Sequence, residues 1–187
     1  MASKEDQRAK ATERLAGHLL ATGLGQTSLR QLAKAAQVSD RMLLYYFESK
    51  EDALAQALAL VAGGLTDVLN ASIPDGSRFT PSELARKTSA LVLDDGTKPF
   101  FRLWTEMIAA AARDEAPYTD IVRAIAEGFL VWLESHLEGS DKDQRQANAA
   151  MILAQVDGLA LLEICTDTDR VRMAANQLAR LEHPRTK

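Results

Sequence analysis

The stretch SLRQLAKAAQVSDRMLLYYFESK, residues 28–50, carries the pattern that decides the fold. Apolar residues recur at helical spacing on both sides of Gln37, which is typical of two short helices joined by a tight turn. Ser28 and Ser39 stand where helix caps belong, and Asp40 lies in the first turn of the second helix, where a negative charge suits the helix dipole. Such a pair, with the second helix free to enter a major groove, is a helix-turn-helix.

The expected contact between these two helices is apolar, because packing sets the angle between them. It would be made by Leu32, Ala36, Val38, Leu43 and Tyr46, with the small Ala33 at the closest approach. The side chains left facing outward from the second helix are Asp40, Arg41, Met42, Leu44 and Tyr45. Helix-turn-helix spacing alone is only moderately specific, since many helical hairpins share it.

The remainder of the chain is also predicted to be helical, and no stretch alternates as a strand. Caps, glycines and prolines predict helices at about residues 8–22, 49–69, 80–93, from 99, 118–137 and 141–165, and a last helix that follows a turn at 166–168 and runs to about 181. Thr27 and Ser28 are alternative caps for the helix that follows them. With the helix-turn-helix pair, this gives an all-α chain of about nine helices, and the tail after His183-Pro184 is expected to fray.

Charge is unevenly distributed along the 187 residues, whose net charge is −4. Residues 8–50 hold seven basic and three acidic side chains, so they carry 7 − 3 = +4 and the rest sums to −8. A basic end on an acidic body favours a polyanionic partner such as nucleic acid at that end. The plain alternative is a solvated face.

Several classes of protein are disfavoured. Cys165 is the single cysteine, so no intramolecular disulfide can form, which fits a reducing compartment, and its apolar neighbours predict a buried thiol. The first ten residues lack a signal-peptide pattern, and no apolar run approaches the roughly 20 residues that cross a bilayer.

An enzyme also finds little support. The three histidines lie in separate segments without metal-ligand spacing, and there is neither a glycine-rich phosphate loop nor a nucleophile elbow. We therefore expect no catalytic residues, no metal, no cofactor and no membrane partner.

A wider set of residues resembles a known family. Residues 8–54 resemble the amino-terminal domain of the tetracycline-repressor (TetR) family of bacterial regulators. The matching residues are Gly23 to Ser28, Leu32, Ala33, Ala36, Val38, Ser39, Leu43, Tyr45, Tyr46, Phe47, Ser49, Lys50, Glu51 and Leu54. Two positions depart from the family pattern: Gln37 stands where glycine is usual, and Leu44 replaces the first aromatic residue of the usual pair.

The resemblance implies an architecture and a function. Residues 1–48 would form a three-helix DNA-binding domain, and residues 49–187 a helical bundle that binds an effector and dimerises. The chain would be a cytoplasmic transcriptional regulator, expected to act as a repressor. It would bind double-stranded DNA at a palindromic operator as a homodimer, and a small apolar or aromatic effector of unknown identity would release it. The alternatives are a DNA-binding regulator that senses no small molecule and an all-α ligand carrier with no DNA role.

Ten residues are the candidates for contact with DNA: Thr27, Ser28, Ser39, Asp40, Arg41, Met42, Leu44, Tyr45, Tyr46 and Lys50. Arg41 is the best candidate for reading a guanine edge, and Lys50 for meeting a phosphate at a helix amino terminus. Leu44 could touch a thymine methyl group. The competing roles are a solvated lysine for Lys50, helix capping for Thr27 and an exposed arginine for Arg41.

Large apolar side chains gather in the body, where the family resemblance implies an effector pocket. The candidates are Phe100, Phe101, Trp104, Met107, Phe129, Trp132, Met151 and Gln155, with Arg102, Glu106 and Asp157 as further polar contacts. An ordinary hydrophobic core would explain most of the apolar ones equally well.

Small residues mark the helix predicted at 141–165. Ala150, Ala154 and Gly158 stand four apart on one face, which lets another helix approach closely. Together with Leu162 and with Leu178 on the last helix, they are the candidate dimer interface. The alternative is close packing within one chain.

Overall fold

The structure is a computed structural model that describes residues 3–181, with the backbone alone for residues 179–181. The all-α prediction is confirmed: the described residues form nine α-helices and one 3-10 helix, and their only strand-like pairing is a single bridge between Phe79 and Leu137. The tail after His183-Pro184, expected to fray, lies outside the described residues.

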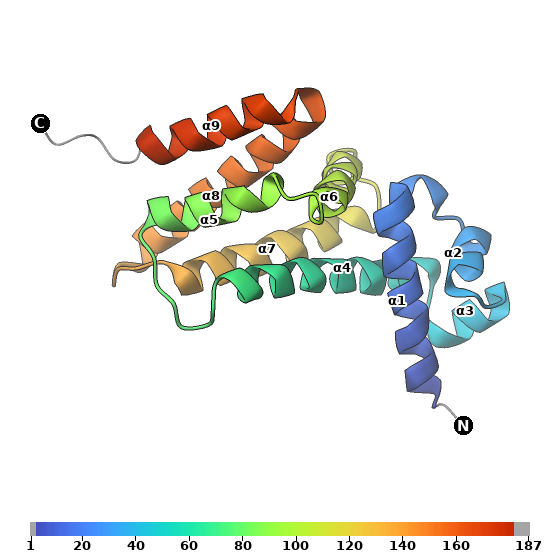
Figure 1. Ribbon diagram of the computed structural model, residues 1–187. Helices are drawn as coiled ribbons and strands as arrows, with labels where there is room; N and C mark the ends of the chain where they lie inside the picture. The colour runs from blue at the N-terminus through green and yellow to red at the C-terminus, as the bar shows by residue number, and fades with distance from the viewer. Residues whose placement is uncertain (1–2, 182–187) are drawn as a thin grey trace, which may run out of the picture. The chain divides into compact units, whose positions relative to one another are not determined.

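The helices follow one another along the chain as drawn in Figure 1. They are α1 (Lys4–Thr22), the 3-10 helix η1 (Gly23–Gln26), α2 (Leu29–Ala36), α3 (Asp40–Tyr46), α4 (Lys50–Ser72), α5 (Pro81–Val92), α6 (Lys98–Ala111), α7 (Tyr118–His136), α8 (Lys142–Cys165) and α9 (Thr168–Leu181).

Two compact units divide the chain. The first holds the residues up to Leu65 together with Arg102–Ile125, and the second holds Thr66–Phe101 together with the residues from Ala126 onward. The long helices α4, α6 and α7 each contribute to both units, so sequence order and packing do not coincide.

The first unit is built around the amino-terminal helices. Its fully buried side chains include Leu15, Leu19, Leu32, Leu43, Phe47, Leu54 and Leu58, which come from α1, α2, the end of α3 and α4. The predicted apolar contact between α2 and α3 is therefore present, with Tyr46 half-buried beside it. Burial of leucine and phenylalanine side chains contributes about 1.5–3 kcal/mol each, which fixes the angle at which α3 leaves the core.

Local capping explains where the helices begin. α1 starts at Lys4, earlier than predicted, because Ser3 and Asp6 form a reciprocal capping box with hydrogen bonds of 2.9 and 3.0 Å. Ser28 and Gln31 form the same arrangement at α2. The choice between two caps is thus resolved in favour of Ser28, and the hydroxyl of Thr27 instead donates to the carbonyl of Leu24 at 3.1 Å.

The second unit is centred on α5, which packs along α8 and α9 (Figure 1). One buried cluster comprises Ile73, Leu84, Ala85, Leu133, Leu137, Ala149 and Ile152. A second comprises Val92, Phe101, Leu159, Ala160 and Val171. Thr80 begins α5 as predicted, with Pro81 in the first turn and Glu83 closing a capping box.

Two expectations about the body were wrong. Cys165 is exposed rather than buried, because it ends α8 on the outward side of that helix. α4 and α8 are also long and apolar enough, by length and composition only, to cross a membrane. The sequence reading missed this because many of their apolar residues are alanines.

Candidate nucleic-acid interface

The third helix presents a set of side chains to solvent. Ser39 caps it, with its hydroxyl accepting a hydrogen bond from the amide of Met42 at 3.2 Å. Leu43 and Phe47 are buried, so the opposite side of α3 faces outward. The predicted outward residues are all exposed there: Asp40, Arg41, Met42, Leu44 and Tyr45. This face combines a guanidinium, a carboxylate and apolar groups, all of which can contact base edges.

The turn before α3 is held in a left-handed conformation. Gln37 has φ 59° and ψ 42°. Its amide donates to the carbonyl of Lys34 at 3.1 Å, and the amide of Val38 donates to that of Ala33 at 3.0 Å. This pair of bonds ends α2 as a Schellman motif, in which glycine is the usual residue at the left-handed position. Gln37, which stands where the family pattern has glycine, therefore adopts a conformation that glycine adopts more easily.

Tyr45 contacts Lys4, a residue that was not among the candidates for DNA contact. The Lys4 ammonium lies 4.3 Å from the centre of the Tyr45 ring, and the centres of the Tyr45 and Tyr46 rings are 5.7 Å apart. A cation over the ring face is attracted by its quadrupole. The capping box of α1 could have revealed Lys4, since it extends that helix to a position beside α3.

Lys50 is the first residue of α4 and is half-buried. Its ammonium lies 3.5 Å from a carboxylate oxygen of Glu51. The pKa of Glu51 is lowered, first by a hydrogen bond from its own backbone amide and also by the Lys50 charge. A phosphate at Lys50 would therefore compete with an ionised neighbour.

A chain of side-chain hydrogen bonds ties α1 to the start of α4. Arg8 donates from Nε to Gln56 at 3.1 Å, and Gln56 donates to Asp52 at 2.7 Å. The other oxygen of Asp52 accepts from the amide of Glu48 at 3.0 Å, in the turn after α3. Asp52 therefore links the turn, α4 and α1, and it helps to hold the recognition surface on a fixed base.

A carboxylate from α6 meets the segment that follows α1. Glu106 accepts a hydrogen bond from the amide of Leu24 at 2.6 Å. Gly23 has φ 66°, and a Cβ at that residue would collide with the Glu106 carboxylate. The structure thus places the Glu106 carboxylate against the segment after α1, and its predicted contact with an effector stays a prediction.

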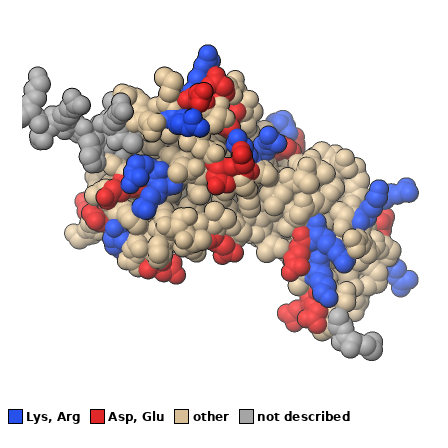
Figure 2. All heavy atoms as spheres, in the orientation of Figure 1, with Lys and Arg blue, Asp and Glu red and all other residues tan. Residues whose placement is uncertain are grey.

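The charges of the interface are mixed. Figure 2 shows lysine and arginine side chains at several places on the surface of the amino-terminal helices, with acidic side chains between them. Within residues 3–178, no group of three or more histidine, cysteine, aspartate or glutamate side chains is placed to hold a metal ion.

The candidate effector residues are distributed over both units. Trp104 and Met107 belong to the first unit, and the other six belong to the second. Phe101 and Met107 are buried, whereas Phe100, Trp104, Phe129, Trp132 and Gln155 are half-buried. Met151 is 63% exposed, on the outward side of α8.

Two of these candidates have polar atoms that are bonded within the second unit. Trp132 donates from its indole nitrogen to Asn70 at 2.7 Å and stacks on His136 at 4.2 Å. Gln155 donates to the hydroxyl of the buried Ser89 at 3.1 Å. An effector that used either donor would have to replace an existing bond.

The candidate dimer residues divide into two groups. Ala150, Ala154 and Gly158 are exposed on α8. Leu162 and Leu178 are half-buried and pack against the apolar cluster around Val92. Packing within the chain therefore already buries much of the Leu162 and Leu178 side chains. The exposed Met173 on α9 was not predicted, because the sequence of a single helix does not show which side its partners cover.

Comparison with known proteins bears on the amino-terminal helices first. Residues 11–58 match the family model of bacterial regulatory proteins of the tetR family, and this match contains α2, α3 and the start of α4. No curated protein sequence matches the chain.

Solved structures extend the likeness to the body. A transcriptional regulator from Rhodococcus sp. Rha1 is 24% identical, with a TM-score of 0.72 over 93% of this chain and 94% of that chain. The multidrug binding protein EbrR, solved with proflavin, is 23% identical, with a TM-score of 0.64 over 92% and 99%. FadR from Bacillus subtilis, solved with stearoyl-CoA, is 18% identical, with a TM-score of 0.56 over 92% and 96%.

These identities are low enough that the structures show a shared fold, while the sequence match identifies the amino-terminal domain. Neither kind of likeness indicates an enzyme family. The amino-terminal segment, residues 11–58, is thus similar to the helix-turn-helix domain of bacterial regulatory proteins of the tetR family, and the chain shares its fold with the transcriptional regulators above.

Proposed function

We propose that the chain is a cytoplasmic repressor that binds a palindromic operator as a homodimer and is released by a small apolar or aromatic effector. Residues 1–48 would bind DNA, and residues 49–187 would bind the effector and dimerise. The observation that carries the DNA-binding part is the outward face of α3, on which Arg41, Leu44 and Tyr45 are exposed above a buried base of leucine and phenylalanine side chains.

The proposed roles in DNA binding follow from chemistry and position. Arg41 can donate two hydrogen bonds to a guanine, and Leu44 can contact a thymine methyl group. Lys50 and the hydroxyls of Thr27, Ser28, Ser39 and Tyr46 would contact phosphates and so orient the helix without reading sequence. Lys4 would add a charge beside Tyr45.

An exposed stripe along α8 supports the homodimer. At 3.6 residues per turn its members fall on one side of the helix, and all are exposed: Ala147, Ala150, Met151, Ala154, Gly158, Leu161 and Cys165. An apolar stripe of this length favours burial against another surface, and its small residues permit close approach of a second helix. In a two-fold symmetric dimer the same patch of each copy forms the interface. Such a dimer would place its two α3 helices about 34–36 Å apart, the spacing of successive major grooves.

An effector is supported by two structures with this fold that were solved with ligands, EbrR with proflavin and FadR with stearoyl-CoA. Within the second unit, the half-buried aromatic side chains of Phe100 and Phe129 would supply an apolar lining of the kind that such ligands need. The effector would act by binding more tightly to a conformation in which the two recognition helices are wrongly spaced. At saturating effector, the affinity for DNA then falls by at most the ratio of the effector's affinities for the two conformations.

The experiment has two steps. A thermal-shift screen of apolar and aromatic compounds identifies ligands that raise the melting temperature, and each is then added to a preformed complex with a selected DNA duplex. The proposal expects a stabilising ligand to weaken DNA binding. If stabilising ligands leave DNA affinity unchanged, the chain does not use them as effectors, and regulation by a partner protein becomes the better explanation.

A further inference from the structure

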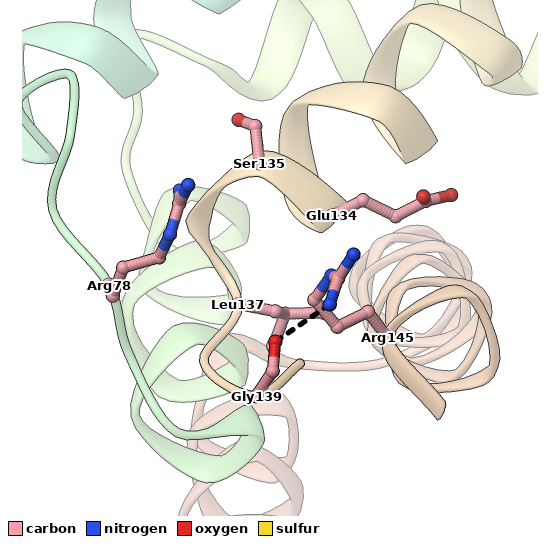
Figure 3. A pocket seen from close by; sticks show the side chains of 6 residues that line it. All are labelled: Arg78, Glu134, Ser135, Leu137, Gly139 and Arg145. Carbon is pink, nitrogen blue, oxygen red and sulfur yellow. Dashed lines mark hydrogen bonds between the residues drawn. The ribbon is translucent and has the colours of Figure 1, made fainter. Parts of the chain in front are cut away.

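A polar cavity of about 390 Å³ lies in the second unit, where the loop before α5, the end of α7 and the start of α8 come together (Figure 3). Its lining residues are Arg78, Glu134, Ser135, Leu137, Gly139 and Arg145. The volume is within the range of small-molecule sites, roughly 300–1,000 Å³. The lining differs from that of an apolar site, however, because most of its groups are charged or polar.

Two guanidinium groups are available in this cavity. Arg78 is exposed and Arg145 is half-buried, and both line the cavity (Figure 3). In the described part of the chain, neither forms an ion pair with a carboxylate. Arg145 donates one hydrogen bond, from Nη1 to the carbonyl of Gly139 at 2.7 Å, and keeps its other donors for a ligand.

The backbone that carries these groups is held in place. The amide of Phe79 donates to the carbonyl of His136, and the amide of Glu138 donates to the carbonyl of Phe79, both at 2.9 Å. These two bonds attach the segment beside Arg78 to the end of α7. The hydroxyl of Ser135 donates to the carbonyl of Trp132 at 2.7 Å, which fixes the side chain on the same wall. A site with anchored backbone loses less conformational entropy when a ligand binds.

We propose that this cavity binds a small polar anion that carries a carboxylate or phosphate group, with Arg78 and Arg145 as its ligands. Guanidinium groups bind both oxyanions through paired hydrogen bonds, so the two sources share one chemistry. Glu134 contributes an opposing charge, which favours an anion that also carries a hydrogen-bond donor. This site shares no residue with the lining proposed above for the apolar effector. Anion binding to it can be measured without DNA.

The test is a titration of the full-length chain, followed by amide resonances in two-dimensional NMR. Inorganic phosphate and malate, each of which carries a hydroxyl donor, are titrated separately, with chloride adjusted to keep ionic strength constant, so that general screening does not change. We expect a saturable shift of the Ser135 and Gly139 amides for at least one anion. The anion that produces it identifies whether the group bound is a phosphate or a carboxylate.

The variants assign the binding to the cavity. Arg78→Ala should weaken it about tenfold or more, the usual effect of losing a charged hydrogen-bonding partner. Arg86→Ala removes an exposed arginine of α5 outside the cavity and should leave the affinity unchanged. Glu134→Gln should tighten phosphate binding by removing the opposing charge, without deleting any donor.

Two results would overturn the inference. One is the absence of a saturable shift in the wild-type chain with either anion. The other is an equal affinity in the Arg78→Ala and Arg86→Ala variants, which would indicate nonspecific attraction. If Arg78→Ala causes widespread resonance changes without ligand, Arg78→Lys decides instead, because it retains the charge but loses the planar fork. Weaker binding by Arg78→Lys than by wild type supports the inference, and equal binding overturns it.

Discussion

The Glu106 carboxylate accepts a hydrogen bond from the backbone amide of Leu24 at 2.6 Å. This bond joins α6 to the segment between α1 and α2, within the first compact unit. Gly23, beside it, adopts φ 66° and ψ −158°, a conformation that is essentially restricted to glycine. The absence of a side chain at Gly23 is what allows the carboxylate to approach the amide.

A double-mutant cycle tests this relationship. Gly23→Ala should lower the free energy of unfolding by about 2 kcal/mol or more, from backbone strain plus the collision with Glu106. Glu106→Ala should cost about 1–3 kcal/mol for the lost charged hydrogen bond. Because Glu106→Ala also removes the collision, the double variant should be more stable than the sum of the two losses predicts. Strict additivity in urea unfolding would show that the two residues act independently.

At the left-handed turn, a substitution is expected to increase stability rather than lower it. Gln37→Gly should raise the free energy of unfolding by about 0.5–1 kcal/mol, since it relieves a left-handed cost of about 1–2 kcal/mol and loses part of that gain to chain entropy. Gln146→Gly, at an exposed helical position of α8, is the control and should destabilise by about 0.5–1 kcal/mol. Equal destabilisation by both substitutions would mean that Gln37 is not strained.

The α8 stripe predicts a dimer that a single charge disrupts. Ala154→Glu would bury an unpaired carboxylate against its symmetry mate, which should shift sedimentation-velocity profiles from dimer to monomer. Ala90→Glu places the same charge on an exposed alanine of α5 and should leave the dimer intact. If Ala154→Glu remains as dimeric as Ala90→Glu, the dimer interface lies elsewhere.

Lys50 should contribute affinity without selectivity. Lys50→Ala is expected to weaken binding to all duplexes by a similar factor and to reduce the slope of log K against log salt by about one per half-site. Lys142→Ala, an exposed lysine at the start of α8, is the matched control and should change neither quantity. A loss confined to one DNA sequence would assign Lys50 a role in base reading instead.

Local sequence signals predicted the helical part of the fold well. Ser28, Ser39 and Thr80 cap helices where expected, because an N-cap acts through the few residues that follow it. The inward position of Leu43 on α3 was also predicted, from its place in the apolar contact with α2. Ser3 was overlooked, although its capping box with Asp6 follows the same rule.

Long-range contacts could not be read from the sequence. The pairing of Glu106 with Leu24 joins residues 82 positions apart, and periodicity says nothing about which carboxylate meets which amide. Cys165 and Met151 are exposed because the packing of α8 against α5 and α9 covers other residues of that helix. The cavity between Arg78 and Arg145 likewise requires the bridge between Phe79 and Leu137, a single pairing too short to give a strand pattern.

The central claim is that the outward face of α3 reads a specific DNA sequence. The most direct test is to select duplexes from a random DNA library and then to measure affinities for the selected and scrambled duplexes at several salt concentrations. We expect the selected site to be palindromic, and we expect binding that is salt-sensitive and stronger for the selected duplex than for the scrambled one. Arg41→Ala should lower that preference by about 1–3 kcal/mol at one base pair of each half-site. Equal, salt-sensitive binding of all duplexes, or no binding at all, would contradict it.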